Sequence, residues 1–434
     1  MFQPTFMKAP PQNSAALSLS IPLRLFTIQE GVRVLDSNTI ATIKATIPVL
    51  ESGGVAITEH FYRRLFSHNP ELLNIFNSSH QHSGGQQVAL FNAIAAYAKH
   101  IETPEALAGA IERIAHKHTS FNIQPAQYDI VGHHLLETLQ ELLGDTFTPE
   151  IRDAWAKAYQ FLAGVFIAKE GELYKTRAAA QGGWKGTRTF IVQSKQKESE
   201  LVTSFVLAPK DGDAVIDFHP GQYIGVKIRP EPDGYEQIRQ YSLSAAPNGA
   251  TYRISVKRES GDKPGLVSNY LHDHVQEGDA IELAAPAGDF TLHAQAGVPT
   301  VLVSAGVGLT PMMSMLEMLT TLEEPAPIHY LHACENGRQH SFKQRVTELL
   351  SQRKNLSAHI WYRQPNDEDK ANQDYHAQGL MDIPGIADKL PLAEGQFYLC
   401  GPTPFMAMAK QQLLSCGVEA ERIHYEVFGP HSDL

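Results

Sequence analysis

Residues 106–121, ALAGAIERIAHKHTSF, carry an apolar stripe in which one core position is occupied by a histidine. Leu107 and Ile111 begin the stripe with helical spacing, and the same spacing continues to position 118. The periodicity therefore predicts that His118 points into the protein. His116 lies about 140° from Ile111 around the helix axis, so we expect it on the solvated side. On this helix alone, a structural histidine held by hydrogen bonds is the commoner interpretation of His118.

The helical pattern around this stretch extends over residues 35–180. Asp36 or Ser37 is a candidate N-cap for the first helix, and Asn69 followed by Pro70 is typical of the start of a short one. Further apolar stripes with helical spacing lie in residues 90–101, 128–142 and 155–170. These stripes predict an all-α domain.

Four segments of this domain resemble a known family. They are EHFYRRLF (59–66), NPELLNIF (69–76), QQVALFNAIAAYAKHIE (86–102) and KHTSFNIQPAQYDIVGHHLL (117–136). They follow one another as in the globin domain of bacterial flavohaemoglobins, which the stretch from Leu35 onward resembles. In that family the histidine that matches His118 is the proximal ligand of haem b iron. The resemblance assigns further residues to the haem site: Tyr62, Phe76, Gln86, Leu90, Lys117, Tyr128 and Glu170.

The binding and activation of O2 at a haem iron would explain why these residue types occur here. Tyr62 and Gln86 would donate hydrogen bonds to O2, which carries partial negative charge when iron binds it. Tyr128 and Glu170 would lie behind the proximal imidazole, where a carboxylate raises its electron donation to the metal. Plain core packing also explains apolar residues of this pocket, and Glu172 is a carboxylate as available as Glu170; only the resemblance selects Glu170.

The periodicity changes after residues 178–188, AAAQGGWKGTR, which we interpret as a connector between domains. Residues 188–296 contain short runs with a period of two, separated by turn residues: LVTSFVLAP, GQYIGVKI, YRISVKR and AIELAAPAGDF. This pattern predicts an antiparallel β-barrel domain.

One strand of this barrel carries binding chemistry. In EQIRQYSLSAAP (236–247), strand alternation puts Arg239 and Tyr241 on one face, where a cation and an aromatic plane suit a flavin dinucleotide. Such a tetrapeptide alone usually means only an exposed strand. The order of segments resembles the FAD domain of the ferredoxin-NADP reductase superfamily, and Ser268 is a candidate cap for a helix that receives the flavin phosphate. The resemblance assigns to FAD Tyr223, Arg239, Gln240, Tyr241, Ser242 and Ser268.

Residues 297–434 alternate buried strands with helices, which predicts an α/β domain with a parallel sheet. In TVLVSAGVGLTPMMSMLEML (300–319), Gly306 and Gly308 would let a pyrophosphate approach the backbone, with a helix beginning after Pro311. The last glycine of a dinucleotide fingerprint is replaced by Pro311, so a tight turn without a ligand is the alternative. The resemblance to NAD(P) domains of the same superfamily assigns to the nucleotide and flavin Gly306, Val307, Gly308, Leu309, Thr310, Pro311, Cys400, Gly401, Glu426, Val427, Phe428, Gly429 and Pro430.

Composition excludes several classes of protein. A net charge of −11 without a basic cluster argues against a nucleic-acid partner, and no apolar run approaches the length of about 20 residues that spans a bilayer. Three scattered cysteines predict a reducing compartment, the cytoplasm. We expect residues 1–34 to be a disordered extension, and we expect a monomer.

The resemblance covers about 400 of the 434 residues and implies one activity above others. We expect a nitric oxide dioxygenase, in which NAD(P)H reduces FAD, FAD reduces haem, and O2 reacts with nitric oxide to give nitrate. Reduction of peroxides, sensing or storage of O2 or nitric oxide, and a haem-free NAD(P)H dehydrogenase are the alternatives. The sequence does not decide between NADH and NADPH.

Overall fold

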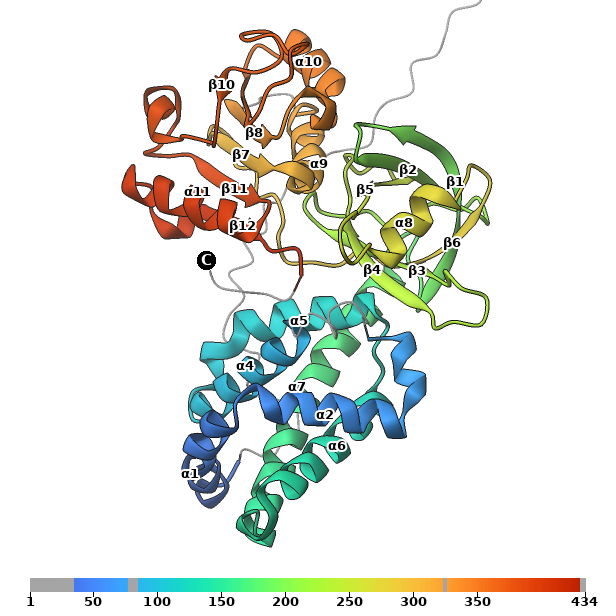
Figure 1. Ribbon diagram of the computed structural model, residues 1–434, viewed down its shortest axis with the longest axis vertical. Helices are drawn as coiled ribbons and strands as arrows, with labels where there is room; N and C mark the ends of the chain where they lie inside the picture. The colour runs from blue at the N-terminus through green and yellow to red at the C-terminus, as the bar shows by residue number, and fades with distance from the viewer. Residues whose placement is uncertain (1–34, 77–84, 323–325, 430–434) are drawn as a thin grey trace, which may run out of the picture. The chain divides into compact units, whose positions relative to one another are not determined.

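A computed structural model describes residues 35–76, 85–322 and 326–429. Residues 1–34, for which we expected a disordered extension, and Pro430 lie outside the described residues. The described chain forms a helical domain, an antiparallel barrel and a parallel α/β sheet in that order (Figure 1).

Within the described residues the helical domain contains six long helices, in agreement with the all-α domain that the apolar stripes predict. Its first helix, α1, begins after Asp36, whose side chain accepts a hydrogen bond from the backbone N of Thr39 at 2.8 Å. Its helices and short 3₁₀ turns are α1 (Ser37–Gly53), α2 (Val55–His68), η1 (Pro70–Asn74), α4 (Gly85–Lys99), η2 (Pro104–Leu107), α5 (Ala108–Ser120), α6 (Pro125–Leu143), η3 (Gly144–Thr146) and α7 (Pro149–Ala179).

Close packing between α6 and α7 requires a glycine. A Cβ atom on Gly132 would lie 2.3 Å from the ring of Tyr159, so only glycine allows the two helices to approach this closely. The hydroxyl of Tyr159 donates to the backbone oxygen of Tyr128 at 2.6 Å. This contact fixes α6, which carries Tyr128, against α7, which carries Glu170.

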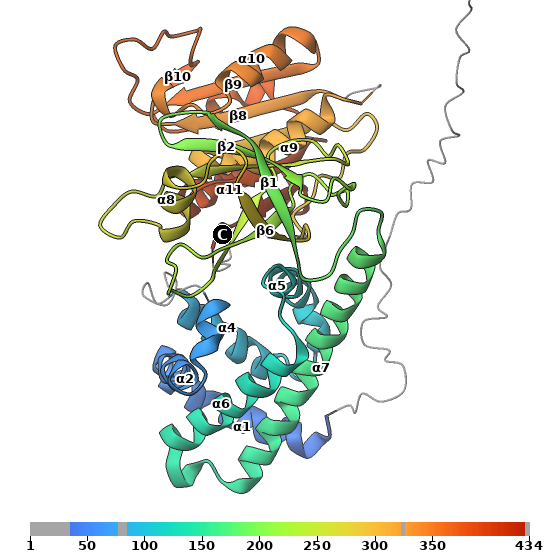
Figure 2. The ribbon, with the colours of Figure 1, turned by 90° about the vertical axis from the view of Figure 1, so that its right-hand side faces the viewer.

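A six-stranded antiparallel sheet follows α7, which leads directly toward β1 (Figure 2). The strand order is β4-β3-β6-β1-β2-β5, and an antiparallel bridge between Leu243 and Ile254 joins the two ends into a barrel. Its strands are β1 (Thr187–Lys197), β2 (Val202–Pro209), β3 (Tyr223–Ile228), β4 (Gln237–Ser242), β5 (Tyr252–Lys257) and β6 (Ala280–Ala284), with helix α8 (Leu266–Asp273) between β5 and β6.

The last part of the described chain is a parallel sheet in the order β10-β9-β8-β7-β11-β12. Its strands are β7 (Thr300–Ala305), β8 (Ile328–Cys334), β9 (Leu356–Tyr362), β10 (Ala377–Gln378), β11 (Gln396–Cys400) and β12 (Ile423–Glu426). Its helices and 3₁₀ turns are η4 (Gly306–Gly308), α9 (Leu309–Leu319), η5 (Gly337–Gln339), α10 (Lys343–Gln352), η6 (Pro384–Lys389), α11 (Thr403–Ser415) and η7 (Ala420–Arg422).

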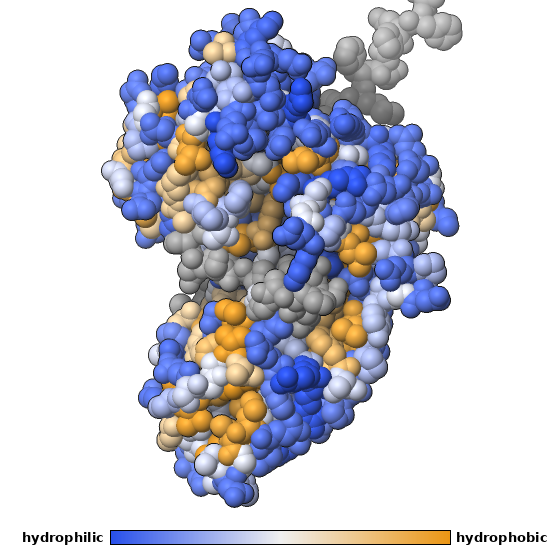
Figure 3. Space-filling model, viewed as in Figure 1, coloured by the Kyte–Doolittle hydropathy of each residue, from blue (hydrophilic) through white to orange (hydrophobic). Residues whose placement is uncertain are grey.

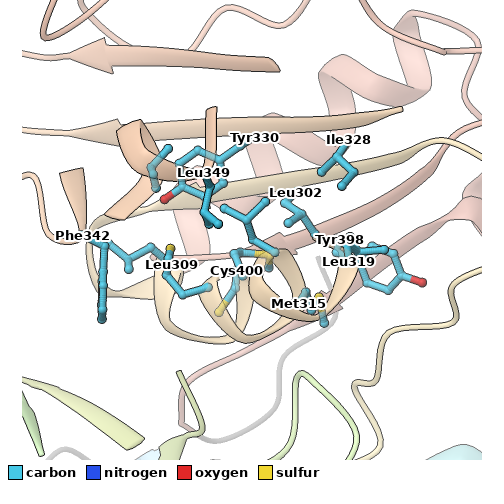
Figure 4. Packing of buried hydrophobic residues seen from close by; sticks show 14 of the residues in the cluster. Leu302, Leu309, Met315, Leu319, Ile328, Tyr330, Phe342, Leu349, Tyr398 and Cys400 are labelled. Carbon is cyan, nitrogen blue, oxygen red and sulfur yellow. The ribbon is translucent and has the colours of Figure 1, made fainter. Parts of the chain in front are cut away.

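Helices cover both faces of this sheet. On one face α9 and α10 pack on strand residues such as Leu302, Tyr330 and Tyr398 (Figure 4). On the other face, Leu413 of α11 packs on residues such as Leu399. Because both faces are buried, the strands are almost continuously apolar, which is why they are visible in the sequence.

Charged and polar residues cover most of the face shown in Figure 3, with apolar patches over parts of the helical domain. Among the described residues, no single helix is long and apolar enough to cross a membrane. Within the same residues, α1 and α2 taken together would be long and apolar enough, but the chain bends by 88° between them.

Two local expectations were wrong. Ser268 does not cap α8, because the helix begins at Leu266 with Gly265 as its N-cap, and the Ser268 hydroxyl instead donates to the backbone oxygen of Gly265 at 3.2 Å. Helix α9 begins at Leu309 rather than after Pro311. Proline is tolerated there because the first turn of a helix does not use its backbone N–H groups.

Candidate functional site

The proximal side of the expected haem site is a compact triad. Nδ1 of His118 lies 2.8 Å from Oε1 of Glu170 and 2.9 Å from the hydroxyl of Tyr128. The Tyr128 hydroxyl donates to the same Oε1 atom of Glu170 at 2.5 Å. Glu170 is 3% exposed, and burial together with its negative charge raises the pKa of Tyr128. The carboxylate therefore accepts two hydrogen bonds inside the domain.

This triad fixes the tautomer of His118. The single hydroxyl proton of Tyr128 goes to Glu170, and a carboxylate has no proton to donate, so Nδ1 of His118 must carry the proton. Nε2 then keeps its lone pair, and it has no hydrogen-bond partner among the described residues. A neutral imidazole that donates from Nδ1 and keeps a free lone pair on Nε2 can serve as the axial ligand of a haem iron, so these residues fit the group.

The residues expected on the distal side also come together. Tyr62 on α2 is 5% exposed, and its hydroxyl makes a hydrogen bond with the side chain of Gln86 on α4. Tyr62, Phe76 and Leu90 belong to one apolar cluster, in which the rings of Tyr62 and Phe76 are 5.8 Å apart at 72°. Burial raises the pKa of Tyr62, so the phenol stays protonated and able to donate.

The expected flavin site lies on paired strands of the barrel. β3 and β4 are antiparallel, with Tyr223 opposite Ser242 and Val226 opposite Arg239. Arg239 and Tyr241 share one face of β4, as the alternation predicts, while Gln240 points to the other face. Gln240 donates to the hydroxyl of Ser120 on α5 at 3.0 Å.

Arg239 supplies a test of whether these residues fit FAD. Its guanidinium donates to the backbone oxygen of Ile238 at 2.8 Å and to Oε1 of Gln237 at 3.2 Å. Within the described residues no carboxylate pairs with it, and burial lowers its pKa. A half-buried cation without an acidic partner suits a doubly charged pyrophosphate, so the strand fits a flavin dinucleotide.

The two glycines in the turn after β7, Gly306 and Gly308, have different surroundings and therefore different roles. Gly306 has a φ of +52° and open space where a Cβ atom would be, so its backbone is available to a ligand. A Cβ on Gly308 would lie 2.2 Å from the backbone oxygen of Cys400, so this glycine lets the turn pack on the end of β11. Thr310 donates to the backbone oxygen of Val307 at 3.0 Å and closes the turn.

Neighbouring expected residues differ in how much they can reach a ligand. Leu309 is 1% exposed and belongs to the core between α9 and the sheet (Figure 4), as does Cys400 at the carboxyl end of β11. Burial raises the pKa of the Cys400 thiol. Gly401 follows Cys400 and packs on Phe405. These residues shape the turn at the strand end, where open α/β sheets place ligands.

The end of β12 and the segment after it place the acid Glu426 two residues before the aromatic Phe428. Phe428 is 46% exposed, Val427 is buried, and Gly429 accepts a hydrogen bond from Nζ of Lys117 at 3.1 Å. Burial raises the pKa of Glu426 to about 8, and the nearby negative charge of Asp289 adds to this effect. Both effects favour the protonated form of Glu426, whereas the charges of Lys117 and Arg113 oppose it.

A cavity of about 150 Å³ adjoins Glu426. It is lined by residues of α5, of the segment after β6 and of the chain around β12: Arg113, Asp289, Phe290, Thr291, His293, His424, Tyr425, Glu426 and Val427. Sequence reasoning did not anticipate it, because its walls come from three distant parts of the chain.

His116 is the residue that sequence reasoning placed wrongly. Its side chain is 12% exposed rather than solvated, and Nδ1 accepts the backbone N–H of Gly288 at 3.0 Å. The helical periodicity describes the helical domain alone, and the barrel covers the side of α5 that this domain leaves open. The polar row Arg113, His116 and Lys117 on this helix was the signal that could have indicated a second contact surface.

Comparison with known families and proteins agrees with this arrangement. The globin family matches residues 59–166, the oxidoreductase FAD-binding domain residues 189–292, and the oxidoreductase NAD-binding domain residues 302–411. A flavohemoprotein from Vibrio cholerae serotype O1 is 54% identical over 403 residues, which cover 92% of this chain and 100% of the relative.

Solved structures give the same result. A flavohemoglobin from Malassezia yamatoensis with bound FAD and heme superposes with a TM-score of 0.80 at 27% identity and covers 91% of this chain and 100% of its own. The FAD/NAD binding domain of a nitric oxide dioxygenase from Vibrio cholerae O1 has a TM-score of 0.51 at 49% identity, over 56% of this chain and 99% of its own. With an all-α globin domain, an antiparallel FAD-binding barrel and a parallel NAD-binding sheet, this chain belongs to the flavohaemoglobin family.

Proposed function

We propose that this chain is a nitric oxide dioxygenase, which converts nitric oxide and O2 to nitrate with electrons from NADH or NADPH. The observation that carries the proposal is the Glu170, Tyr128 and His118 triad in one chain with FAD- and NAD-binding domains. A carboxylate on Nδ1 increases the electron donation of the imidazole, which favours O2 activation over reversible storage.

The reaction balances with one reduced nucleotide for two molecules of nitric oxide. Each nitric oxide combines with one O2 and one electron to give one nitrate. NADH provides two electrons and leaves NAD⁺ and one proton. Bound FAD would supply the conversion of a two-electron donor into single electrons, and bound haem b would supply the iron at which the gases react.

The residues of this chain would provide positions and hydrogen bonds. His118 would hold the haem iron through Nε2, with Glu170 and Tyr128 behind its ring. Phe76 and Leu90 would form part of the apolar wall of the haem pocket. Tyr62 and Gln86 lie together where they would donate hydrogen bonds to bound O2.

The two other cofactor sites would be formed by backbone turns and strands. Arg239 would pair with the FAD pyrophosphate, with Tyr241 as the flat surface beside the ring and Tyr223, Gln240 and Ser242 on the paired strands. Gly306, with the turn at Cys400 and Gly401, would bind the nicotinamide nucleotide, and residues 307–311 would shape the glycine-rich turn. Phe428 would cover the flavin from the segment after β12.

Spectroscopy of the purified protein tests the proposal directly. We expect a haem Soret band, reduction of both flavin and haem by NADH without air, and consumption of nitric oxide with one nitrate formed for each nitric oxide when O2 is admitted. Stopped-flow comparison with alkyl hydroperoxides distinguishes a peroxide reductase. Slow turnover with tight O2 retention would instead indicate a sensor or store, and a protein without a Soret band would be a haem-free dehydrogenase.

We also propose a location and a domain division. All three cysteines, Cys334, Cys400 and Cys416, are free, which suits the reducing cytoplasm where NADH and NADPH are available. The connector at residues 178–188 supports domains at residues 35–180, 188–296 and 297–434. We expect a monomer, which sedimentation analysis checks.

A further inference from the structure

On one side of α5, His116 makes hydrogen bonds that have no part in the proposed haem site. Nδ1 of His116 accepts the backbone N–H of Gly288 and Nη2 of Arg177, each at 3.0 Å. Nε2 lies 3.2 Å from Oε1 of Glu112. His116 is two residues before His118 and points away from the proximal triad toward the barrel.

The hydrogen bonds of His116 fix its orientation. Both partners of Nδ1 are N–H donors, so Nδ1 is the acceptor and Nε2–H donates to Glu112. The pKa of Glu112 is lowered to about 2, first by this hydrogen bond and also by Lys169, whose Nζ lies 2.7 Å away. The imidazole is thus held from both sides, with its acceptor directed at the barrel.

Gly288 connects this contact to the expected flavin site. It follows β6 with a φ of +113°, and a Cβ on it would lie 3.0 Å from the ring of Tyr223. The residue before it, Ala287, exchanges two backbone hydrogen bonds with Tyr223, at 2.8 and 2.9 Å. The backbone that His116 binds is therefore the backbone against which Tyr223 packs.

The same turn of α5 makes two further contacts with the flavin-binding half. Ser120 accepts from Nε2 of Gln240 at 3.0 Å, and Nζ of Lys117 donates to the backbone oxygen of Gly429 at 3.1 Å. Helix α5, seen along its axis in Figure 2, thus carries the haem ligand on one side and these contacts on another.

We propose that His116 is a docking residue, which holds the haem-bearing helix against the flavin-binding strands through Gly288 and so sets the rate of electron transfer from FAD to haem. It is a positioning residue, since it would touch no reacting atom. The inference rests on the proposed electron route from flavin to haem. Electron transfer slows as the distance between donor and acceptor grows, so loosening this interdomain contact has a measurable effect on the rate.

Three substitutions separate the two sides of the imidazole. His116→Asn keeps an acceptor near the position of Nδ1, His116→Gln keeps a polar group near Nε2 that reaches Glu112, and His116→Leu removes both. In anaerobic stopped-flow experiments on the holoprotein, we expect His116→Leu and His116→Gln to slow haem reduction by about two- to tenfold, the change that loss of one hydrogen bond makes in a docking equilibrium. Flavin reduction by NADH and the haem spectrum should stay as in the wild type, and His116→Asn should restore most of the rate.

A second measurement does not depend on activity. Hydrogen exchange of the Gly288 amide should be faster in His116→Leu and His116→Gln than in the wild type and in His116→Asn, because only an acceptor at Nδ1 protects it. Haem reduction at the wild-type rate in His116→Leu would overturn the docking role, as would an equal slowing of flavin reduction. Failure of the wild type itself to reduce its haem would instead overturn the proposed function.

Discussion

At the residue scale, the hydrogen bond that Tyr62 would donate to O2 can be tested by removing its hydroxyl. Tyr62→Phe removes one hydroxyl from a buried position and leaves the apolar cluster intact, so the protein should fold and bind haem. Loss of one charge-assisted hydrogen bond of about 1.5 to 3 kcal/mol should raise the O2 dissociation rate by about ten- to a hundredfold. Flash photolysis or stopped-flow measurement of the O2 off-rate checks this, and an unchanged rate would show that Tyr62 does not contact the ligand.

The structure explains why Glu170, and not the nearby Glu172, lies beside His118. Glu170 and Glu172 are two residues apart, so they point to different sides of α7. Only Glu170 is buried against His118 and Tyr128, whereas Glu172 is exposed. The resemblance to the family selected Glu170, and the helix geometry gives the physical reason.

At the scale of elements, the turn between β7 and α9 has one glycine that is needed for packing, Gly308, and one that is open to a ligand, Gly306. Gly308→Ala should cost about 1 to 3 kcal/mol or more in the free energy of unfolding, because the new Cβ would meet the backbone oxygen of Cys400 at 2.2 Å. Gly306→Ala meets no atom and costs only the strain of a positive φ, about 1 kcal/mol. Urea unfolding measures both values.

Nucleotide binding should show the opposite order of effects. A methyl group on Gly306 would project into the open space beside the turn and should weaken NADH binding, measured by calorimetry on the folded protein. If Gly306→Ala bound NADH as the wild type does, the turn would serve packing alone.

Another element-scale prediction concerns the contact of α2 and α6 at His134. Its Nδ1 accepts from Nη1 of Arg64 at 2.9 Å, so its Nε2–H donates to Oδ1 of Asn69 at 2.8 Å. Burial, and then the charge of Arg64, lowers the pKa of His134 below its usual value. The folded imidazole is therefore neutral where the unfolded one already binds a proton.

The sign of the pH effect follows from this shift. Below about pH 6.5 the unfolded chain binds more protons at this position than the folded chain, so stability is lost as the pH falls. His134→Gln can accept and donate without titrating, and its urea midpoint should fall less between pH 7 and pH 5. His100→Gln, at an exposed position after α4, is the control that should keep the wild-type dependence.

At the scale of the whole molecule, the separate cores of the globin and reductase parts make their functions separable. The helical domain, the barrel and the parallel sheet each have their own buried apolar clusters. His118→Ala should therefore lose haem but keep NADH-dependent reduction of an artificial dye within about twofold, since no described hydrogen bond links His118 to the barrel. Loss of dye reduction together with the Soret band would show that the reductase depends on the haem domain.

Local patterns in the sequence were enough to predict a helical domain, an antiparallel barrel and a parallel α/β sheet in that order, whereas most of the expected site residues came from the family resemblance. Helical periodicity predicted that His118 points into the helical domain, where its Nδ1 reaches Glu170. A capping residue marked the helix start at Asp36, and strand alternation put Arg239 and Tyr241 on one face, because these features depend on neighbours within one element. Glu170 needed the family resemblance. The helix starts at Ser268 and Pro311 were misjudged: α8 begins at Leu266 and α9 at Leu309, and neither helix has a side-chain cap that the sequence could show.

Only the tertiary structure decided what lies between elements. Gly308, which was expected to serve a pyrophosphate, also makes room for the end of β11, and His116 was expected in solvent but binds the barrel. The cavity beside Glu426 is formed by three distant segments. Periodicity shows which side of a helix its own domain buries, but a second domain can cover the remaining side. That contact depends on residues more than a hundred positions away in the chain.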